Sequence, residues 1–188
     1  MQKPDYEDNF RATLKRLLAE THNLLSVQAS LEALYEALVH HQTGSIILEQ
    51  SFNAFIGDRL ARLIRMLEDS EETASFWYLH RCERDNVAKD IDIARLKDLS
   101  SKDKLRLIRD KAFFHIDKDH VADSQAVYKR ANIFASEIIW AMEAIWRTLN
   151  RLYAERFGQP YEQAHMTLPG ARETFKRDLA KLLGAAGK

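Results

Sequence analysis

The sequence contains little cysteine, glycine and proline, and it carries no net charge. Its single cysteine, Cys82, excludes an intrachain disulfide and argues against a cysteine-based zinc site. Lysine plus arginine number 28, as do aspartate plus glutamate, so the basic excess typical of nucleic-acid-binding proteins is missing. Any contact with nucleic acid must therefore depend on local clusters of charge.

Long apolar runs are also missing. No stretch approaches the ~20 apolar residues that cross a membrane, and the first residues, MQKPDYEDNF, contain no apolar signal region. We therefore expect a cytoplasmic protein with no membrane partner. The sequence contains no P-loop glycine pattern, zinc motif or nucleophile elbow, so we expect neither a cofactor nor a metal.

The distribution of glycine and proline predicts the fold class. Neither residue occurs from 58 to 157, and the 188-residue chain is long enough to bury a sizeable core. Apolar residues recur at helical spacing, as shown by Phe10, Leu17, Leu24 and Leu31 at intervals of seven. The sequence therefore predicts an all-α protein, an antiparallel helical bundle with a long penultimate helix and a short C-terminal helix.

Local signals place the helices. We expect them over residues 5–41, 45–68, from about 71, within 83–99, over 101–115, 122–156 and 171–183. The segment 21–26, THNLLS, weakens the first of these helices. Ser70 is expected to cap the third helix, and Ser100 with Asp103 resembles a capping box for the helix over 101–115. Gly158 and Pro160 should end the long helix.

Apolar positions within these elements define the expected core. In the second helix the buried face should consist of Leu48, Phe52, Phe55, Ile56, Leu60, Leu63 and Leu67. The segment 75–80 supplies aromatic side chains, and Val87, Ile91 and Leu96 are the expected anchors of the charged segment that follows. Arg59, Arg62 and Arg65 lie on another side of the second helix, either as a solvated face or as part of a rim that attracts phosphate.

Chemistry is concentrated in one segment, IRDKAFFHIDKD, which begins at Ile108. Arg109 is followed by the polar Asp110, and His115 comes after a short spacer. This pattern resembles the motif of the HEPN superfamily (higher eukaryotes and prokaryotes nucleotide-binding domains), and the sequence of the segment is most similar to the abortive-infection branch. The resemblance in architecture covers roughly residues 5–157. We divide the chain into a HEPN-like bundle over 1–157 and a C-terminal extension over 158–188.

The resemblance implies a function. HEPN nucleases typically place two such motifs across a dimer cleft, so we expect a homodimer that cuts RNA within a bacterial abortive-infection or toxin–antitoxin defence system against phage. An antitoxin or another protein partner is implied as well. In some HEPN toxins a tyrosine two residues after the histidine is modified by a partner enzyme. Here Asp117 occupies that position, which does not fit this mode of regulation.

The residue types suit cleavage of RNA without a metal. RNA supplies its own 2′-hydroxyl nucleophile, and a histidine with a pKa near 6.5 can move a proton at neutral pH. An arginine can hold phosphate bidentately and stabilise the developing charge. We therefore assign catalysis to Arg109 and His115, with Asp110 orienting either residue. A local basic patch for RNA binding consists of Lys102, Lys104, Arg106 and Lys111.

Other interpretations of the same residues stay open. A histidine at a helix C-terminus is favourable through the dipole alone, and Arg109 could simply pair with Asp110 or Asp117. The acidic residues after His115 match no EF-hand loop, and the adjacent His40 and His41 would point about 100° apart on a helix, so metal binding is a minor option at both places. The alternatives to a nuclease are a non-catalytic HEPN module that binds nucleotide, RNA or a protein, and an unrelated helical interaction protein.

Overall fold

The structure, a computed structural model, describes residues 4–41, 46–113 and 126–186. All regular structure within these ranges is helical, which confirms the all-α prediction. None of the described helices combines the length and the apolar content needed to cross a membrane. The HEPN type of the fold stays a prediction.

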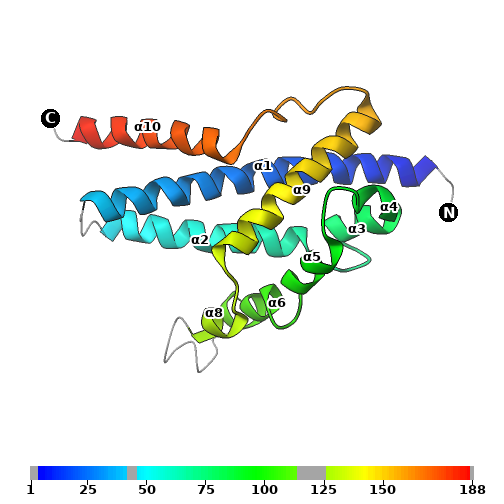
Figure 1. Ribbon diagram of the computed structural model, residues 1–188, viewed down its shortest axis with the longest axis horizontal. Coiled ribbons are helices and arrows are strands. Elements are labelled where there is room, and N and C mark those ends of the chain that lie inside the picture. The colour runs from blue at the N-terminus through cyan, green and yellow to red at the C-terminus, as the bar shows by residue number, and fades with distance from the viewer. Residues whose placement is uncertain (1–3, 42–45, 114–125, 187–188) are drawn as a thin grey trace.

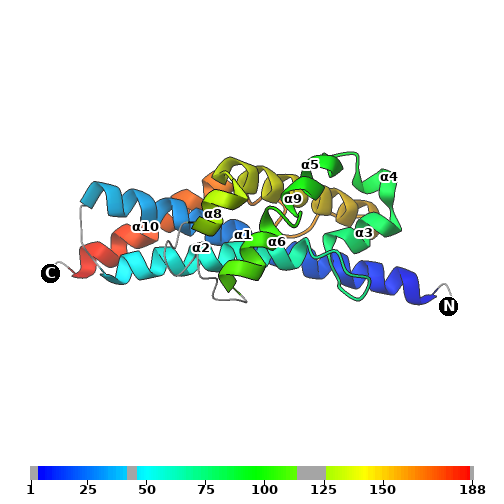
Figure 2. The same cartoon turned by 90° about the horizontal axis from the view of Figure 1, so that it is seen from below.

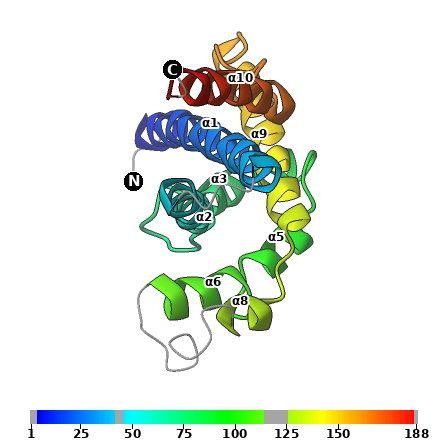
Figure 3. The ribbon, with the colours of Figure 1, turned by 90° about the vertical axis from the view of Figure 1, so that its left-hand side faces the viewer.

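Three long helices form an elongated layer with α1 in the middle (Figures 1 and 3). The 38-residue α1 (Pro4–His41) lies between α2 (Ile46–Met66) and α10 (Leu168–Ala186). The α2 helix returns antiparallel to α1, whereas α10 runs parallel to it (Figures 1 and 2). Two ion pairs in the same register, Arg172 with Glu32 and Lys176 with Glu36, join α10 to α1. The sequence predicted an antiparallel bundle, and this prediction is wrong for α10, which runs parallel to α1.

The α1 helix continues through the segment that was expected to weaken it. The Thr21 hydroxyl donates to the Leu17 carbonyl at 2.7 Å, and the Ser26 hydroxyl donates to the His22 carbonyl at 3.0 Å. These side chains thus bond to the preceding turn of the same helix instead of leaving it. Leu24 and Leu25, both fully buried, anchor the segment in the core.

A second group of helices crosses one side of this layer (Figure 3). The largest is α9 (Ala135–Phe157), whose buried stripe includes Ile138, Ile145, Leu149 and Leu152. The others are short: α3 (Phe76–Cys82), α4 (Arg84–Val87), α5 (Ile93–Leu99), α6 (Leu105–Ile108), the π-helical turn η1 (Arg109–Phe113) and α8 (Ala126–Ala131). Phe76 and Trp77 are buried as predicted, as are the three anchors Val87, Ile91 and Leu96.

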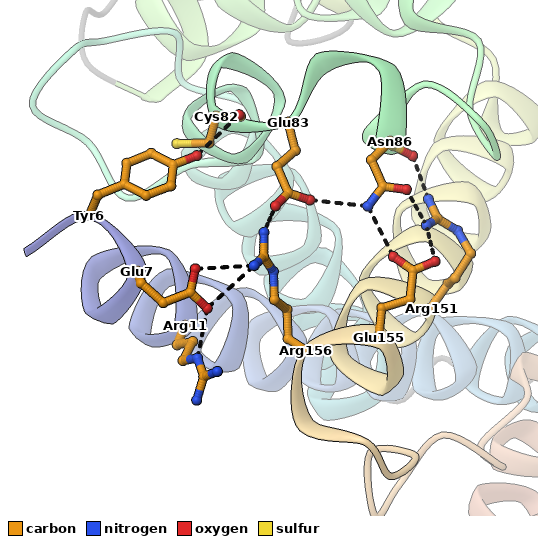
Figure 4. A network of polar contacts seen from close by, with 9 residues as sticks. All are labelled: Tyr6, Glu7, Arg11, Cys82, Glu83, Asn86, Arg151, Glu155 and Arg156. Carbon is orange, nitrogen blue, oxygen red and sulfur yellow. Dashed lines mark hydrogen bonds and ion pairs between the residues drawn. The ribbon is translucent and has the colours of Figure 1, made fainter. Parts of the chain in front are cut away.

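Polar contacts fasten the C-terminal end of α9 to the other elements (Figure 4). The Arg156 guanidinium pairs with Glu7 of α1 and with Glu83, which directly precedes α4. One turn earlier, Arg151 pairs with Glu155 and donates to the Asn86 side chain in α4. Nearby, the Tyr6 hydroxyl donates to the Cys82 carbonyl. Burial, together with the neighbouring Cys82 thiol, raises the pKa of Tyr6 to about 12. The N-terminal turns of α1 are thereby held against α3, α4 and α9.

Two predicted helix starts were wrong. The third helix begins at Phe76 with Ser75 as its N-cap residue, because Thr73 holds the preceding segment in a turn by donating to the Glu68 or Ser70 carbonyl. Ser70 therefore caps no helix. Ser100 ends α5, where its hydroxyl donates to the Lys97 carbonyl, and α6 does not begin until Leu105. The expected capping box with Asp103 is not formed.

The long penultimate helix predicted over 122–156 is interrupted. The chain leaves α8 at Asn132, which has a left-handed φ of 47°, and α9 starts only at Ala135. The Phe134 backbone N–H donates to the Glu137 carboxylate at 2.9 Å, which satisfies an N-terminal donor of α9. Phe134 itself is 60% exposed. Among the described helices α1 is the longest. Residues 122–125, where the predicted helix was expected to begin, lie outside the described ranges.

The C-terminal helix and the apolar face of α2 also differ from the prediction. The Thr167 hydroxyl accepts from the Gly170 N–H, so α10 begins at Leu168 and is longer than expected. Gly158 ends α9 in the left-handed conformation, as predicted. Leu60 and Leu63 of α2 are buried, as is Leu67 just beyond it, whereas Leu48, Phe52, Phe55 and Ile56 are only partly covered. The first half of α2 lies beyond the reach of α9, so fewer neighbours cover it (Figure 1).

The break at Asn132 can be tested by substitution. We expect Asn132→Gly to leave stability nearly unchanged, because glycine adopts a positive φ without strain. Asn132→Ala should lower the free energy of unfolding by about 1 kcal/mol, since a Cβ disfavours this conformation. Urea denaturation followed by circular dichroism measures both, with Asn53→Ala on the exposed side of α2 as the control. Equal midpoints for Asn132→Ala and the wild type would contradict the left-handed break.

Candidate functional site

Arg109 is the first residue of the π-helical turn η1, directly after α6. Leu105 and Ile108 of α6 are each only 1% exposed. These two side chains anchor the short helix in the core. The position of Arg109 at the surface therefore depends on apolar contacts made by the residues immediately before it.

Two carboxylates bind the Arg109 guanidinium. Its Nε donates to Oδ1 of Asp110 at 2.7 Å, and one of its terminal nitrogens donates to Oε1 of Glu68 at 3.3 Å. The Arg109 side chain is 26% exposed, so part of the group still faces solvent. The sequence anticipated a pairing of Arg109 with Asp110, and the orienting role of Asp110 stays a prediction, whereas Glu68, near the end of α2, was not anticipated.

His115 lies outside the described residues, as do Asp117, Asp119, His120 and Asp123. The structure therefore shows neither the distance between Arg109 and His115 nor their relative orientation. Their joint action stays a prediction from the sequence.

The four predicted RNA-binding cations have different surroundings. Lys104 bonds to Asp98 at 2.8 Å and to Glu137 at 3.0 Å, and these contacts raise its pKa. Its ammonium therefore links the start of α6 to the first turn of α9. Lys102 is exposed, while Arg106 and Lys111 are half-buried. Among the four, Lys102 is the most accessible to a ligand.

A cleft of about 300 Å³ lies next to Glu68, between α1 and the end of α2. It is lined by Arg16, Leu17, Glu20, Arg62, Arg65, Met66, Glu68, Thr73 and Ala74. Glu68 thus lines the cleft and also accepts the hydrogen bond from Arg109. The sequence had suggested a phosphate-attracting rim for Arg62 and Arg65, but it gave no indication that Arg16 and Glu68 would join them, since these residues are distant along the chain.

The arginines of α2 do not form one surface. Arg59 donates to the Gln28 side chain at 2.7 Å, and burial lowers its pKa. Arg62 is held by Asp58 at 2.8 Å and by Glu20 at 3.0 Å. Only Arg65 is exposed. The predicted rim is therefore reduced to Arg65, with Arg62 serving as a fixed wall of the cleft.

A larger cavity of about 490 Å³ separates α1 from the start of α10. Apolar Ala29, Met166 and Phe175 line it together with His22 and His165. The Ser26 and Ser30 hydroxyls on its α1 wall already donate to backbone carbonyls of their own helix. Within the described ranges, no three histidine, cysteine or acidic side chains gather in a way that could hold a metal ion.

Comparisons with protein-family models, with curated proteins and with solved structures found no significant match.

The contact between Lys104 and Glu137 has a testable pH dependence. The hydrogen bond from the Phe134 N–H, together with Lys104, lowers the pKa of Glu137. A lowered folded-state pKa stabilises the fold above the unfolded glutamate pKa of about 4.3, and this contribution is lost as the pH falls through the folded-state value. We expect Glu137→Ala to reduce the free energy of unfolding by about 1 kcal/mol at neutral pH, a typical cost of losing a helix cap.

Urea denaturation at neutral and acidic pH measures this effect. The difference between wild type and Glu137→Ala should shrink once the carboxylate is protonated in both folded and unfolded chains. Glu143→Ala, on the same helix and half-buried, is the matched control for loss of a glutamate outside the first turn of α9. A pH-independent cost of Glu137→Ala would exclude the ionised carboxylate as its cause.

Proposed function

We propose that the chain is a metal-independent endoribonuclease of a bacterial abortive-infection or toxin–antitoxin system. The supporting observation is the setting of Arg109. Its partly exposed guanidinium is held by Asp110 at the start of a π-helical turn, beside an arginine-lined cleft and six residues before His115. Such turns are frequently found at functional sites.

The proposed mechanism uses groups that the chain supplies. His115 removes the proton from the ribose 2′-hydroxyl, and the 2′-oxygen attacks the adjacent phosphorus. Arg109 binds the phosphate oxygens and stabilises the negative charge that develops on them. The bond from phosphorus to the 5′-oxygen then breaks, and a protonated histidine returns a proton to the leaving oxygen. The products are a 2′,3′-cyclic phosphate and a 5′-hydroxyl.

Two copies of the chain form the proposed catalytic assembly. Each copy contributes one Arg109–His115 pair, so a symmetric dimer supplies both a proton acceptor and a proton donor at one cleft. Pairing about a two-fold axis is the commonest arrangement of homo-oligomers. An antitoxin would act on this assembly as a protein partner.

The ion pairs of Arg109 favour a second candidate function. A phosphate must compete with Glu68 and Asp110 for the guanidinium, and both carboxylates lie within hydrogen-bonding distance. If these contacts persist, the arginine serves the structure, and the chain is a non-catalytic helical module that binds RNA, nucleotide or a protein. Activity measurements on variants distinguish these two functions.

Catalysis is tested by removing each proposed group separately. His115→Ala should lower the cleavage rate by about 10²–10⁴-fold, the usual contribution of a general acid–base group. Arg109→Ala should cost a similar factor, and Arg109→Lys should not restore full activity, because an ammonium lacks the planar fork. Cleavage of labelled RNA in the presence of EDTA measures the rates and identifies the cyclic phosphate.

Arg147→Ala is the control for loss of an exposed arginine, because this residue lies on α9 and lines neither cavity. Circular dichroism should show an unchanged helical content for all of these variants. Cutting that requires added magnesium, or an equally active His115→Ala/Arg109→Ala double variant, would rule out the proposed mechanism in favour of the binding module.

The assembly is tested by light scattering of the purified full chain. We expect a mass twice that of the 21.8 kDa monomer. A mixture of the Arg109→Ala and His115→Ala chains shows whether Arg109 and His115 act within one chain or across the interface, because mixed dimers regain activity only if the two residues act across the interface. A purely monomeric protein at high micromolar concentration would exclude the dimeric site.

A further inference from the structure

We propose that Arg16 and Arg65 bind backbone phosphates of single-stranded RNA in the cleft between α1 and the end of α2. The identity of the ligand rests on the ribonuclease proposed above, whereas the cleft and its charges come from the described structure. No pattern in the sequence joins these two residues, which lie on different helices.

The cleft is accessible from solvent. Arg16 on α1 and Arg65 on α2 both line it, and both side chains are exposed. Neither makes an ion pair with another described side chain. Two guanidinium groups on separate helices therefore face one opening of about 300 Å³.

The other charged groups of the cleft are already engaged. Glu20 accepts from Arg62 at 3.0 Å, and Glu68 accepts from Arg109 at 3.3 Å. Arg62 also bonds to Asp58, so its position is fixed from two directions. Each carboxylate lining the cleft thus has an arginine partner, and the charges left available to a ligand are both positive.

A phosphate suits this arrangement for geometric reasons. The planar guanidinium presents paired N–H donors that match two phosphate oxygens. The Thr73 hydroxyl donates to a backbone carbonyl and so offers no donor of its own to an anion. Arg16 and Arg65 would therefore supply the direct contacts.

Glu68 connects the cleft to Arg109. Because the same carboxylate lines the cleft and bonds to Arg109, a strand bound by Arg16 and Arg65 passes close to the proposed catalytic arginine. Contacts to phosphates read no base sequence, so binding through this cleft should be independent of sequence and sensitive to salt. The negative charges of Glu20 and Glu68 oppose the ligand, and Glu68→Gln should therefore strengthen binding.

The test is RNA binding by the full chain carrying His115→Ala, in EDTA, so that the RNA stays intact. Fluorescence anisotropy with a labelled single-stranded oligoribonucleotide gives the dissociation constant over a range of salt. Adding Arg16→Gln and Arg65→Gln should weaken binding about tenfold. The negative slope of log affinity against log salt should become shallower by about 1.4, because two phosphate contacts are lost. Arg147→Gln, which also removes an exposed arginine, should change neither value.

The possible results separate this inference from the proposed nuclease activity. Weaker binding after Arg16→Gln and Arg65→Gln supports the cleft, even if the wild-type chain cuts no RNA. Equal binding by this variant, or an equal loss with Arg147→Gln, overturns the cleft even if cutting is observed. A mononucleotide that competes as strongly as the oligoribonucleotide overturns the RNA strand as ligand and assigns the two arginines to a free nucleotide phosphate.

Discussion

Burial of α1 along most of its length is the interaction on which the other elements depend. The helix spans roughly 57 Å at 1.5 Å per residue, and its apolar residues belong to the main core cluster from Phe10 to Ala29. Where α2 and α10 flank it, the consecutive residues from Gln28 to Leu31 are all buried. A helix covered on several sides cannot be moved without separating its neighbours, so α1 fixes the layer against which the shorter helices pack.

The proposed site lies where the short helices meet this layer. Arg109 belongs to η1, yet one of its two carboxylate partners, Glu68, comes from just beyond the end of α2. The neighbouring cleft has one wall from α1 and another from α2 and the turn after it. The layer of long helices thus supplies the arginines of the cleft, whereas the π-helical turn η1 supplies Arg109.

The carboxylates of Asp110 and Glu68 have two opposing effects on phosphate binding by Arg109. Asp110 and Glu68 hold Arg109 in a defined position, which would lower the entropic cost of binding a phosphate. The same carboxylates repel an anion and compete for the guanidinium. The Arg109 side chain is 26% exposed, and its partners Glu68 and Asp110 are 40% and 50% exposed, so solvent reaches both ion pairs and screens them in part. This balance is why a catalytic and a structural role of Arg109 must be separated by measuring activity.

The sequence by itself determined the helical class, most of the core positions and the end of α9 at Gly158, because these follow from local spacing and backbone preference. The adjacency of Arg109 and Asp110 also made their contact predictable. Only the tertiary structure decided that α1 continues through Thr21, that the chain turns at Asn132 and that Glu68 reaches Arg109 from 41 residues away. These features depend on burial and on contacts between elements, which local patterns do not encode. The same holds for Arg16 and Arg65, since their shared cleft exists only once α1 and α2 are packed together.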